Sequence, residues 1–151
     1  MTAIGLDFGE RRIGVAASDP LGVLAQPVAV IERGSLLEDI GRIGVIAKQR
    51  RAEKIVLGLP LNMDRTVGPQ ARRARRFAAR LRRELGLEVV LWDERLSTVE
   101  ADESMSRGVE EPRRHAPAAR ERNERRRRRD AVAAAVILQD YLEAQRRSEK
   151  A

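Results

Sequence analysis

The segment Ala3-Ile4-Gly5-Leu6-Asp7-Phe8 predicts the first strand of a sheet. Its large apolar residues alternate with small or acidic ones, which is the period-two pattern of a strand. The turn Gly9-Glu10-Arg11 and a second alternating segment, Arg12–Ala17, follow directly, so we expect a hairpin. A third strand, Val23–Ile31, contains Pro27, and a proline places a strand at the edge of a sheet.

After the third strand the pattern changes to helices separated by strands. Ser35-Leu36-Leu37-Glu38 has the form of a capping box, which opens a helix that we expect to end near Arg51. The further elements expected, in chain order, are a buried parallel strand Lys54–Leu59, a loop Pro60–Pro69, an amphipathic helix Gln70–Leu85, a strand Glu88–Trp92, a helix from Ser97 to Gly108, a mobile loop 109–125, a helix from about Glu124 to Gln145 and a frayed tail 146–151. The order β-β-β-α-β-α-β-α-α predicts one α/β domain over residues 1–151, with a five-stranded mixed sheet flanked by helices.

The charge of the chain favours a polyanionic partner. Its 151 residues contain 30 Lys+Arg against 23 Asp+Glu, a net charge of +7, and all but three of the cations are arginine. A strongly basic balance is typical of proteins that bind nucleic acid. Two phenylalanines, one tryptophan and one tyrosine are too few for base-stacking platforms, so contacts to phosphates should dominate.

Composition also bears on location. The chain has no cysteine, which excludes disulfides and thiolate metal sites and predicts a reducing, cytoplasmic location. We expect no signal peptide, because the apolar start lacks a basic leader and is interrupted by Asp7. The longest uninterrupted apolar run, Ala131–Leu138, is too short to span a bilayer.

Asp7 is an acid inside a strong strand pattern. Its expected face is made small by Ala3 and Gly5, which leaves room for an ion or a phosphate against the backbone. The alternative is that Asp7 merely ends a strand before the Gly9 turn.

Asp93 and Glu94 follow directly on the fifth strand. In open α/β sheets, ligands collect at the carboxyl ends of the strands. Alternatively, these acids only favour the start of the following helix. Because the two residues point to opposite faces, strand alternation does not choose between them.

Asp130 opens the most buried-looking part of the last helix and shares the inward side of Ala134 and Ile137. A buried carboxylate needs an arginine or a metal, and Arg126 is the unremarkable candidate partner. If the acids converge, an oxygen-only cluster suits Mg²⁺ or Mn²⁺ rather than zinc. The single histidine, His115, lies in the expected loop and is better explained as a solvated residue than as a catalytic base.

Four ordered blocks resemble one known family. They are Ile4–Gly9 with Arg12–Ala16 and Ser18-Asp19, then Val56–Asp64, then Asp93–Thr98, and finally Asp130 with Ala133-Ala134 and Ile137-Leu138. The chain resembles the YqgF/RuvX family of the RNase H-like superfamily, whose members are described as Holliday junction resolvases and as the nuclease that matures the 5′ end of pre-16S ribosomal RNA. The resemblance covers about residues 2–142. Two departures are Arg65, where the family commonly has glycine, and the unusually basic run Arg125–Arg129.

The resemblance implies an RNase H fold and a catalytic, metal-binding triad of Asp7, Glu94 and Asp130. It further implies two Mg²⁺ or Mn²⁺ ions and a nucleic-acid substrate, either pre-rRNA or branched DNA. In that fold the first strand lies between the second and the fourth, so Asn62 and Asp64 would border Asp7 as substrate contacts. Their alternative role is to form the turn.

Arginines near these acids are candidates for binding the substrate backbone, because a guanidinium clamps a phosphate through two hydrogen bonds. The arginines expected to do so are Arg12, Arg95, Arg125, Arg126, Arg127, Arg128 and Arg129. A stripe on the helix Gln70–Leu85, formed by Arg73, Arg76, Arg80 and Arg83, is a weaker candidate.

Three functions compete. The first is a metal-dependent endonuclease, which would need a homodimer for the paired cleavage of a junction. The second is a non-catalytic rRNA-, ribosome- or DNA-binding factor that keeps the fold. Phosphotransfer in the manner of actin and hexokinase is discounted, because it needs two such domains.

Overall fold

The computed structural model describes residues 1–93 and 119–149. In this part of the chain five strands form one mixed sheet in the order β3-β2-β1-β4-β5. The strands are β1 (Ala3–Phe8), β2 (Arg12–Ser18), β3 (Ala25–Glu32), β4 (Lys54–Leu59) and β5 (Glu88–Asp93). β1, β2 and β3 pair antiparallel, whereas β1, β4 and β5 run parallel. The expected mixed sheet, with the first strand between the second and the fourth, is confirmed.

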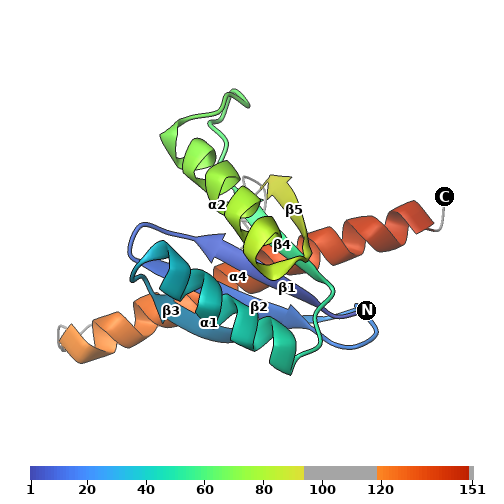
Figure 1. Cartoon of the computed structure of the whole chain (residues 1–151), viewed down its shortest axis with the longest axis horizontal. Coiled ribbons are helices and arrows are strands. Elements are labelled where there is room, and N and C mark those ends of the chain that lie inside the picture. The colour runs from blue at the N-terminus through green and yellow to red at the C-terminus, as the bar shows by residue number, and fades with distance from the viewer. Residues whose placement is uncertain (94–118, 150–151) are drawn as a thin grey trace, which may run out of the picture.

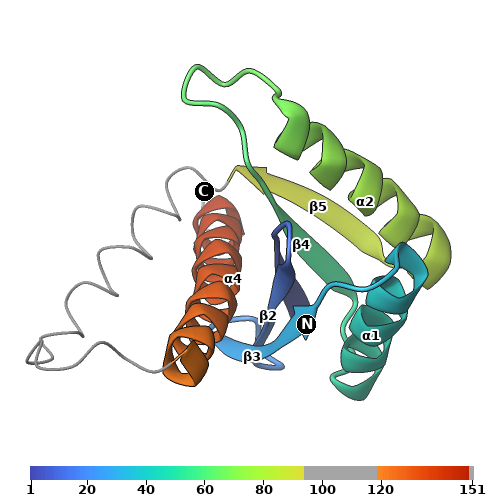
Figure 2. The same ribbon diagram turned by 90° about the vertical axis from the view of Figure 1, so that its left-hand side faces the viewer.

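Helices cover both faces of the sheet. α1 (Leu36–Gln49) and α2 (Pro69–Leu85) lie on one face, and α4 (Ala119–Glu149) crosses the other face as a single long rod (Figure 1). The view along the sheet in Figure 2 shows the three layers side by side. Since β1, β4 and β5 are parallel, their carboxyl ends meet at one edge of the sheet.

The local start and stop signals act as expected. Ser35 caps α1: its Oγ accepts a hydrogen bond from the Glu38 N–H at 3.2 Å and donates one to Glu38 Oε1 at 3.1 Å. α2 ends at Gly86, whose φ of 66° is the left-handed conformation that glycine adopts without strain. Pro27 lies on the edge strand β3, beside an irregularity in the pairing of β2.

The last helix is longer than its apolar pattern indicated. It begins at Ala119 rather than near Glu124, and it ends at Glu149 rather than at Gln145. Residues 119–125 are therefore helical and not part of a loop, and residues 146–149 are helical and not a frayed tail. The physical reason is that Arg, Glu and Ala favour helix without any apolar periodicity. The expected helix 97–108 and the remainder of the expected loop lie outside the described residues.

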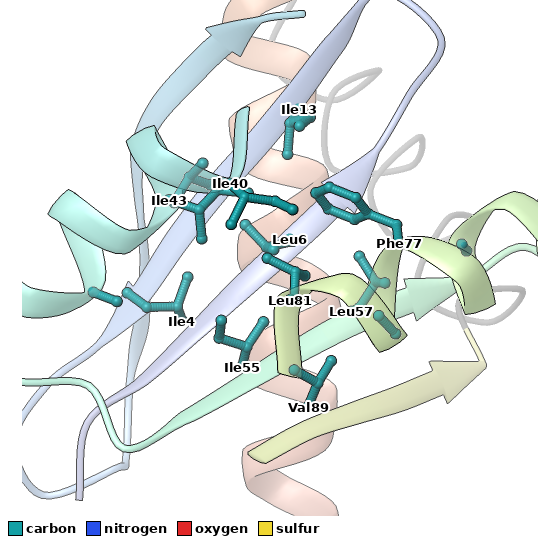
Figure 3. Packing of buried hydrophobic residues seen from close by; sticks show 14 of the residues in the cluster. Ile4, Leu6, Ile13, Ile40, Ile43, Ile55, Leu57, Phe77, Leu81 and Val89 are labelled. Atoms are coloured by element: carbon teal, nitrogen blue, oxygen red, sulfur yellow. The ribbon is translucent and has the colours of Figure 1, made fainter. Parts of the chain in front are cut away.

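Large apolar side chains fill the space between the sheet and the pair α1 and α2 (Figure 3). The cluster includes Ile4, Leu6, Ile13, Ile43, Ile55, Leu57, Phe77 and Leu81, all at most 2% exposed. Buried apolar surface contributes roughly 25 cal/mol per Å², so this layer contributes substantially to the stability of the fold. No helix among residues 1–93 and 119–149 is long and apolar enough to cross a membrane.

On β1 and β2 the opposite face of the sheet is built from small residues, and α4 packs directly on them. A Cβ on Gly5 would lie 2.7 Å from Leu138 Cβ and 2.9 Å from the Ala134 carbonyl oxygen, and one on Gly14 would overlap the carbonyl oxygen of Asp130. The sequence-based interpretation of this small face as room for an ion is therefore wrong beside Gly5, because the helix backbone occupies that room.

Gly14 is the position most sensitive to added volume. We expect Gly14→Ala to lower the free energy of unfolding by about 3 kcal/mol or more, because a methyl group there must push α4 off the sheet. Gly41→Ala is the matched control. Position 41 lies inside α1 with nothing within 4 Å of an added Cβ, so alanine should raise stability by about 0.5–1 kcal/mol. Urea unfolding of both variants measures the difference, and equal effects would contradict the close approach of α4.

Candidate active site

Asp7 and Asp130 meet across the end of the β1–β2 hairpin. Asp7 pairs with Gly14 in the sheet, and the backbone of α4 at Asp130 lies directly against Gly14. Burial, together with the negative charge of Asp130, raises the pKa of the half-buried Asp7 to about 6. Two carboxylates that are far apart in the sequence thus interact electrostatically at one place.

One arginine compensates part of this charge. Nε of Arg12, on β2, lies 2.8 Å from Asp130 Oδ2, and the two side chains are only 18% and 30% exposed. Arg126, the partner considered from the sequence, forms no such contact with Asp130 in the described residues. The side chain of Asp7 makes no hydrogen bond or ion pair with any residue in 1–93 or 119–149.

The two carboxylates fit a divalent cation. Carboxylate oxygens are the ligands that Mg²⁺ and Mn²⁺ prefer. Because burial and then the negative charge of Asp130 raise the pKa of Asp7, a cation between the two acids would favour the ionised form of Asp7. The described residues contain no cluster of three or more acidic or histidine ligands, and the expected third ligand, Glu94, lies outside them.

A pocket of about 190 Å³ opens beside Asp7. Its lining residues are Asp7, Phe8, Gly9, Glu10, Arg33, Pro60, Gln70 and Arg73. Two of them, Arg33 and Arg73, are cationic. Arg73 belongs to the arginine stripe seen in the sequence. Arg33 carried no sequence signal, because it follows an edge strand and belongs to no periodic pattern.

Asn62 and Asp64 hold their own loop together. Asn62 Nδ2 donates to Thr66 Oγ1 at 2.9 Å, and the Thr66 N–H and Oγ donate to Asp64 Oδ1 at 3.0 and 2.6 Å. The two bonds from Thr66 lower the pKa of Asp64. Arg65, where the resembled family commonly has glycine, has a left-handed φ of 68°. Asn62 lines a second pocket that shares Glu10, Pro60, Gln70 and Arg73 with the first, whereas Asp64 lines neither.

The basic run 125–129 lies on α4, immediately before Asp130. Arg126, Arg128 and Arg129 are exposed, and Arg127 Nη2 lies 2.7 Å from Glu32 Oε1. The run therefore forms a charged approach to Asp130. Glu94, Arg95 and His115 lie outside the described residues.

Comparisons with known proteins show what the chain as a whole is similar to. Residues 1–144 match the RuvX family model, described as Holliday junction resolvase. A protein of Caldanaerobacter subterraneus named "Putative pre-16S rRNA nuclease" is 40% identical over 148 residues, which cover 98% of this chain and 100% of the relative. A relative of the same name from Myxococcus xanthus is 44% identical over 146 residues, covering 97% and 90% of the two chains.

Two solved structures share the fold. Thermus thermophilus RuvC in complex with a Holliday junction substrate has a TM-score of 0.55 at 17% identity, covering 96% of this chain and 95% of that one. The Fowlpox virus resolvase with Holliday junction DNA has a TM-score of 0.56 at 10% identity, covering 96% and 99%. These likenesses confirm the RNase H-like fold that the sequence blocks implied.

The raised pKa of Asp7 predicts that the folded protein loses stability as the pH rises. Because the pKa is higher in the folded chain than the ordinary value of 3.8, stability should fall as pH rises from about 4 to 6 and stay low above 6. Asp7→Asn should therefore raise the free energy of unfolding of the metal-free protein by about 1–3 kcal/mol at pH 7.5, and the gain should vanish near pH 4. The measurement is urea unfolding across this pH range.

Glu53→Gln is the control for this measurement. Glu53 is an exposed carboxylate at the opposite end of the strands, where β1 and β4 begin. It should show no comparable pH-dependent gain. An Asp7→Asn protein that is less stable than the parent at pH 7.5 would contradict the electrostatic account of the site.

Proposed function

The chain belongs to the RuvX family, and on this basis we propose that it is a divalent-metal-dependent endonuclease that hydrolyses phosphodiester bonds of structured nucleic acid. The observation that carries the proposal is the meeting of Asp7 and Asp130, from β1 and α4, at the carboxyl-end edge of the sheet. The proposal is further supported by the family match over residues 1–144.

We propose that Asp7 and Asp130, completed by Glu94, hold Mg²⁺ or Mn²⁺. A pair of such ions supplies an activated water and stabilises the charge that develops on the leaving oxygen. Asp7 contributes a carboxylate with no cationic partner among the described residues. Arg12 fixes Oδ2 of Asp130 and leaves Oδ1 without a hydrogen bond to any described residue. Because Gly14 has no side chain, α4 packs close to the sheet there, and this close packing keeps Asp130 near Asp7.

The proposed substrates are the 5′ region of pre-16S rRNA, which the names of the relatives indicate, and branched DNA, which the family description indicates. We expect recognition through backbone and shape, because the chain is rich in arginine and poor in aromatic residues. Paired cleavage of a four-way junction needs two active sites, so that activity would require a homodimer. A cytoplasmic location is proposed because the names of the relatives indicate precursor rRNA as substrate and because the chain has no cysteine.

A non-catalytic nucleic-acid-binding factor is the second candidate. The Arg12–Asp130 ion pair favours it, because this pair neutralises one acid without a metal. Against it stands Asp7, whose carboxylate would repel a polyanion unless a cation neutralises it.

The nuclease proposal predicts that Asp7→Asn abolishes cleavage. We expect a loss of about 10³-fold or more, because the variant removes a carboxylate that holds the catalytic cations. The assay compares a four-way DNA junction and an RNA with a pre-16S 5′ leader, each with Mg²⁺, with Mn²⁺ and with EDTA. Glu53→Gln is again the control and should cleave as the parent does.

Metal-independent cleavage, or unchanged turnover by Asp7→Asn, would refute the proposal. Nucleic-acid binding without cleavage under any of these conditions would favour the non-catalytic factor. If the junction is cut in pairs, the same sample should have the solution mass of a dimer, and a strict monomer would contradict paired cleavage by two active sites.

The arginine run on α4 predicts a change in salt dependence. Replacing Arg126, Arg128 and Arg129 by glutamine should reduce the slope of log affinity against log salt by roughly 0.7–0.9 for each phosphate that the variant no longer binds. The control replaces Arg50, Arg51 and Arg147 by glutamine, since these exposed arginines lie at the opposite edge of the sheet. An equal change in both triple variants would assign the effect to net charge alone.

A further inference from the structure

Arg33 is held against the end of β1 by several independent contacts. Its backbone N–H donates to the Arg11 carbonyl at 2.9 Å, which ties the end of β3 to the β1–β2 turn. Its guanidinium carbon lies 4.5 Å from the centroid of the Phe8 ring, and Phe8 in turn stacks on Phe77 at 4.3 Å. Nη1 donates to the Gly9 carbonyl at 3.3 Å. The guanidinium is thereby fixed beside the residues that follow Asp7.

A buried carboxylate completes this support. Asp39, in the first turn of α1, is fully buried, and its Oδ1 accepts a hydrogen bond from the Gly34 N–H at 2.9 Å. Its Oδ2 lies 3.6 Å from Arg33 Nε, and both of these buried atoms lack a hydrogen-bond partner among the described residues. Burying a charge away from water is unfavourable unless an opposite charge is near. Asp39 therefore acts on Arg33 as a fixed counter-charge from behind.

The outer part of the guanidinium remains available. Arg33 Nη2 makes no hydrogen bond within residues 1–93 and 119–149, and Arg33 lines the 190 Å³ pocket that also contains Asp7. Arg73 contributes a second guanidinium to this pocket, where its Nη1 lies 3.7 Å from the exposed carboxylate of Glu10. This pocket thus has two guanidinium groups beside a candidate metal-binding carboxylate. Such a pocket suits an anionic group that is covalently linked to the group that reacts at the carboxylate.

We propose that this pocket binds a phosphate of the substrate backbone next to the phosphate that is cleaved, that Arg33 is the group that binds it, and that Asp39 is the positioning residue of Arg33. The proposal rests on the nuclease function proposed above. A guanidinium immobilised before binding loses little conformational entropy when it meets a phosphate, which is why a fixed arginine binds better than a free one. The alternative is that Arg33 and Asp39 form an ion pair that serves folding alone.

Three variants separate the two roles: Arg33→Gln, Asp39→Asn and the double variant. The probes are a fluorescein-labelled four-way DNA junction and a labelled pre-16S leader RNA, with binding measured by anisotropy in EDTA over a salt series. Arg33→Gln should weaken binding about 10–100-fold and reduce the salt slope by roughly 0.7–0.9. Thermal unfolding of the same samples reports the structural role.

The double variant decides between the alternatives. Arg33→Gln alone leaves the buried Asp39 charge without its partner and should lower the melting temperature. Adding Asp39→Asn removes that charge, so the melting temperature should recover while binding stays weak. If binding recovers together with stability, or if Arg33→Gln binds as the parent does, the phosphate site is refuted.

Two further variants sharpen the test. Arg33→Lys keeps the charge and loses the planar fork, so it should retain most of the salt slope with reduced affinity. Arg147→Gln removes one exposed arginine at the far end of α4 and should leave affinity within about 2-fold of the parent. An Arg147→Gln variant that loses as much affinity as Arg33→Gln would overturn the assignment.

The source of the phosphate is tested with inorganic phosphate as a competitor. Stabilisation of the parent but not of Arg33→Gln by micromolar inorganic phosphate would assign the pocket to a free anion and overturn the backbone assignment. Binding is measured without divalent ions, so the two proposals can fail separately. If only the nuclease proposal fails, cleavage is absent but Arg33→Gln still reduces the slope of log affinity against log salt. If only the phosphate site fails, the parent cleaves but Arg33→Gln leaves the slope of log affinity against log salt unchanged.

Discussion

The close contact between α4 and the small face of the sheet positions the candidate active site. Gly5 and Gly14 have no side chains, so the helix backbone approaches β1 and β2 within van der Waals distance. Because of this contact, Asp130 lies against Gly14, which pairs with Asp7 across the β1–β2 hairpin. Any side chain at Gly14 would separate the two acids, so the packing of this face and the chemistry of the site depend on the same two glycines.

The site is organised at the expense of local stability, which is common where function requires like charges to meet. Asp7 and Asp130 repel each other, and only Asp130 has an arginine beside it among the described residues. The opposite face supplies the compensation. There a layer of large apolar side chains under α1 and α2 holds the sheet rigid, so the carboxyl end of β1 can carry an unfavourable charge.

Two adjacent residues at the end of β1 serve the two faces of the sheet. Asp7 turns toward α4 and Asp130, whereas Phe8 turns toward α2 and carries the guanidinium of Arg33 on its ring. Alternation along a strand makes this possible, because neighbouring side chains point to opposite faces yet remain at one edge. The acids and the proposed phosphate site therefore come together at this edge, although their side chains come from different layers.

Local patterns in the sequence determined the five strands, the Ser35 cap, the edge position of the Pro27 strand and the candidacy of Asp7 and Asp130, because each depends on residues close together in the chain. Tertiary structure alone decided that Arg12 rather than Arg126 pairs with Asp130, that α4 fills the small face, and that the buried Asp39 lies behind Arg33. These contacts join residues on different elements, and no spacing rule within one segment encodes how closely two backbones approach. The length of α4 was missed for a different reason: charged residues with high helix propensity extend a helix without the apolar period that marks its buried part.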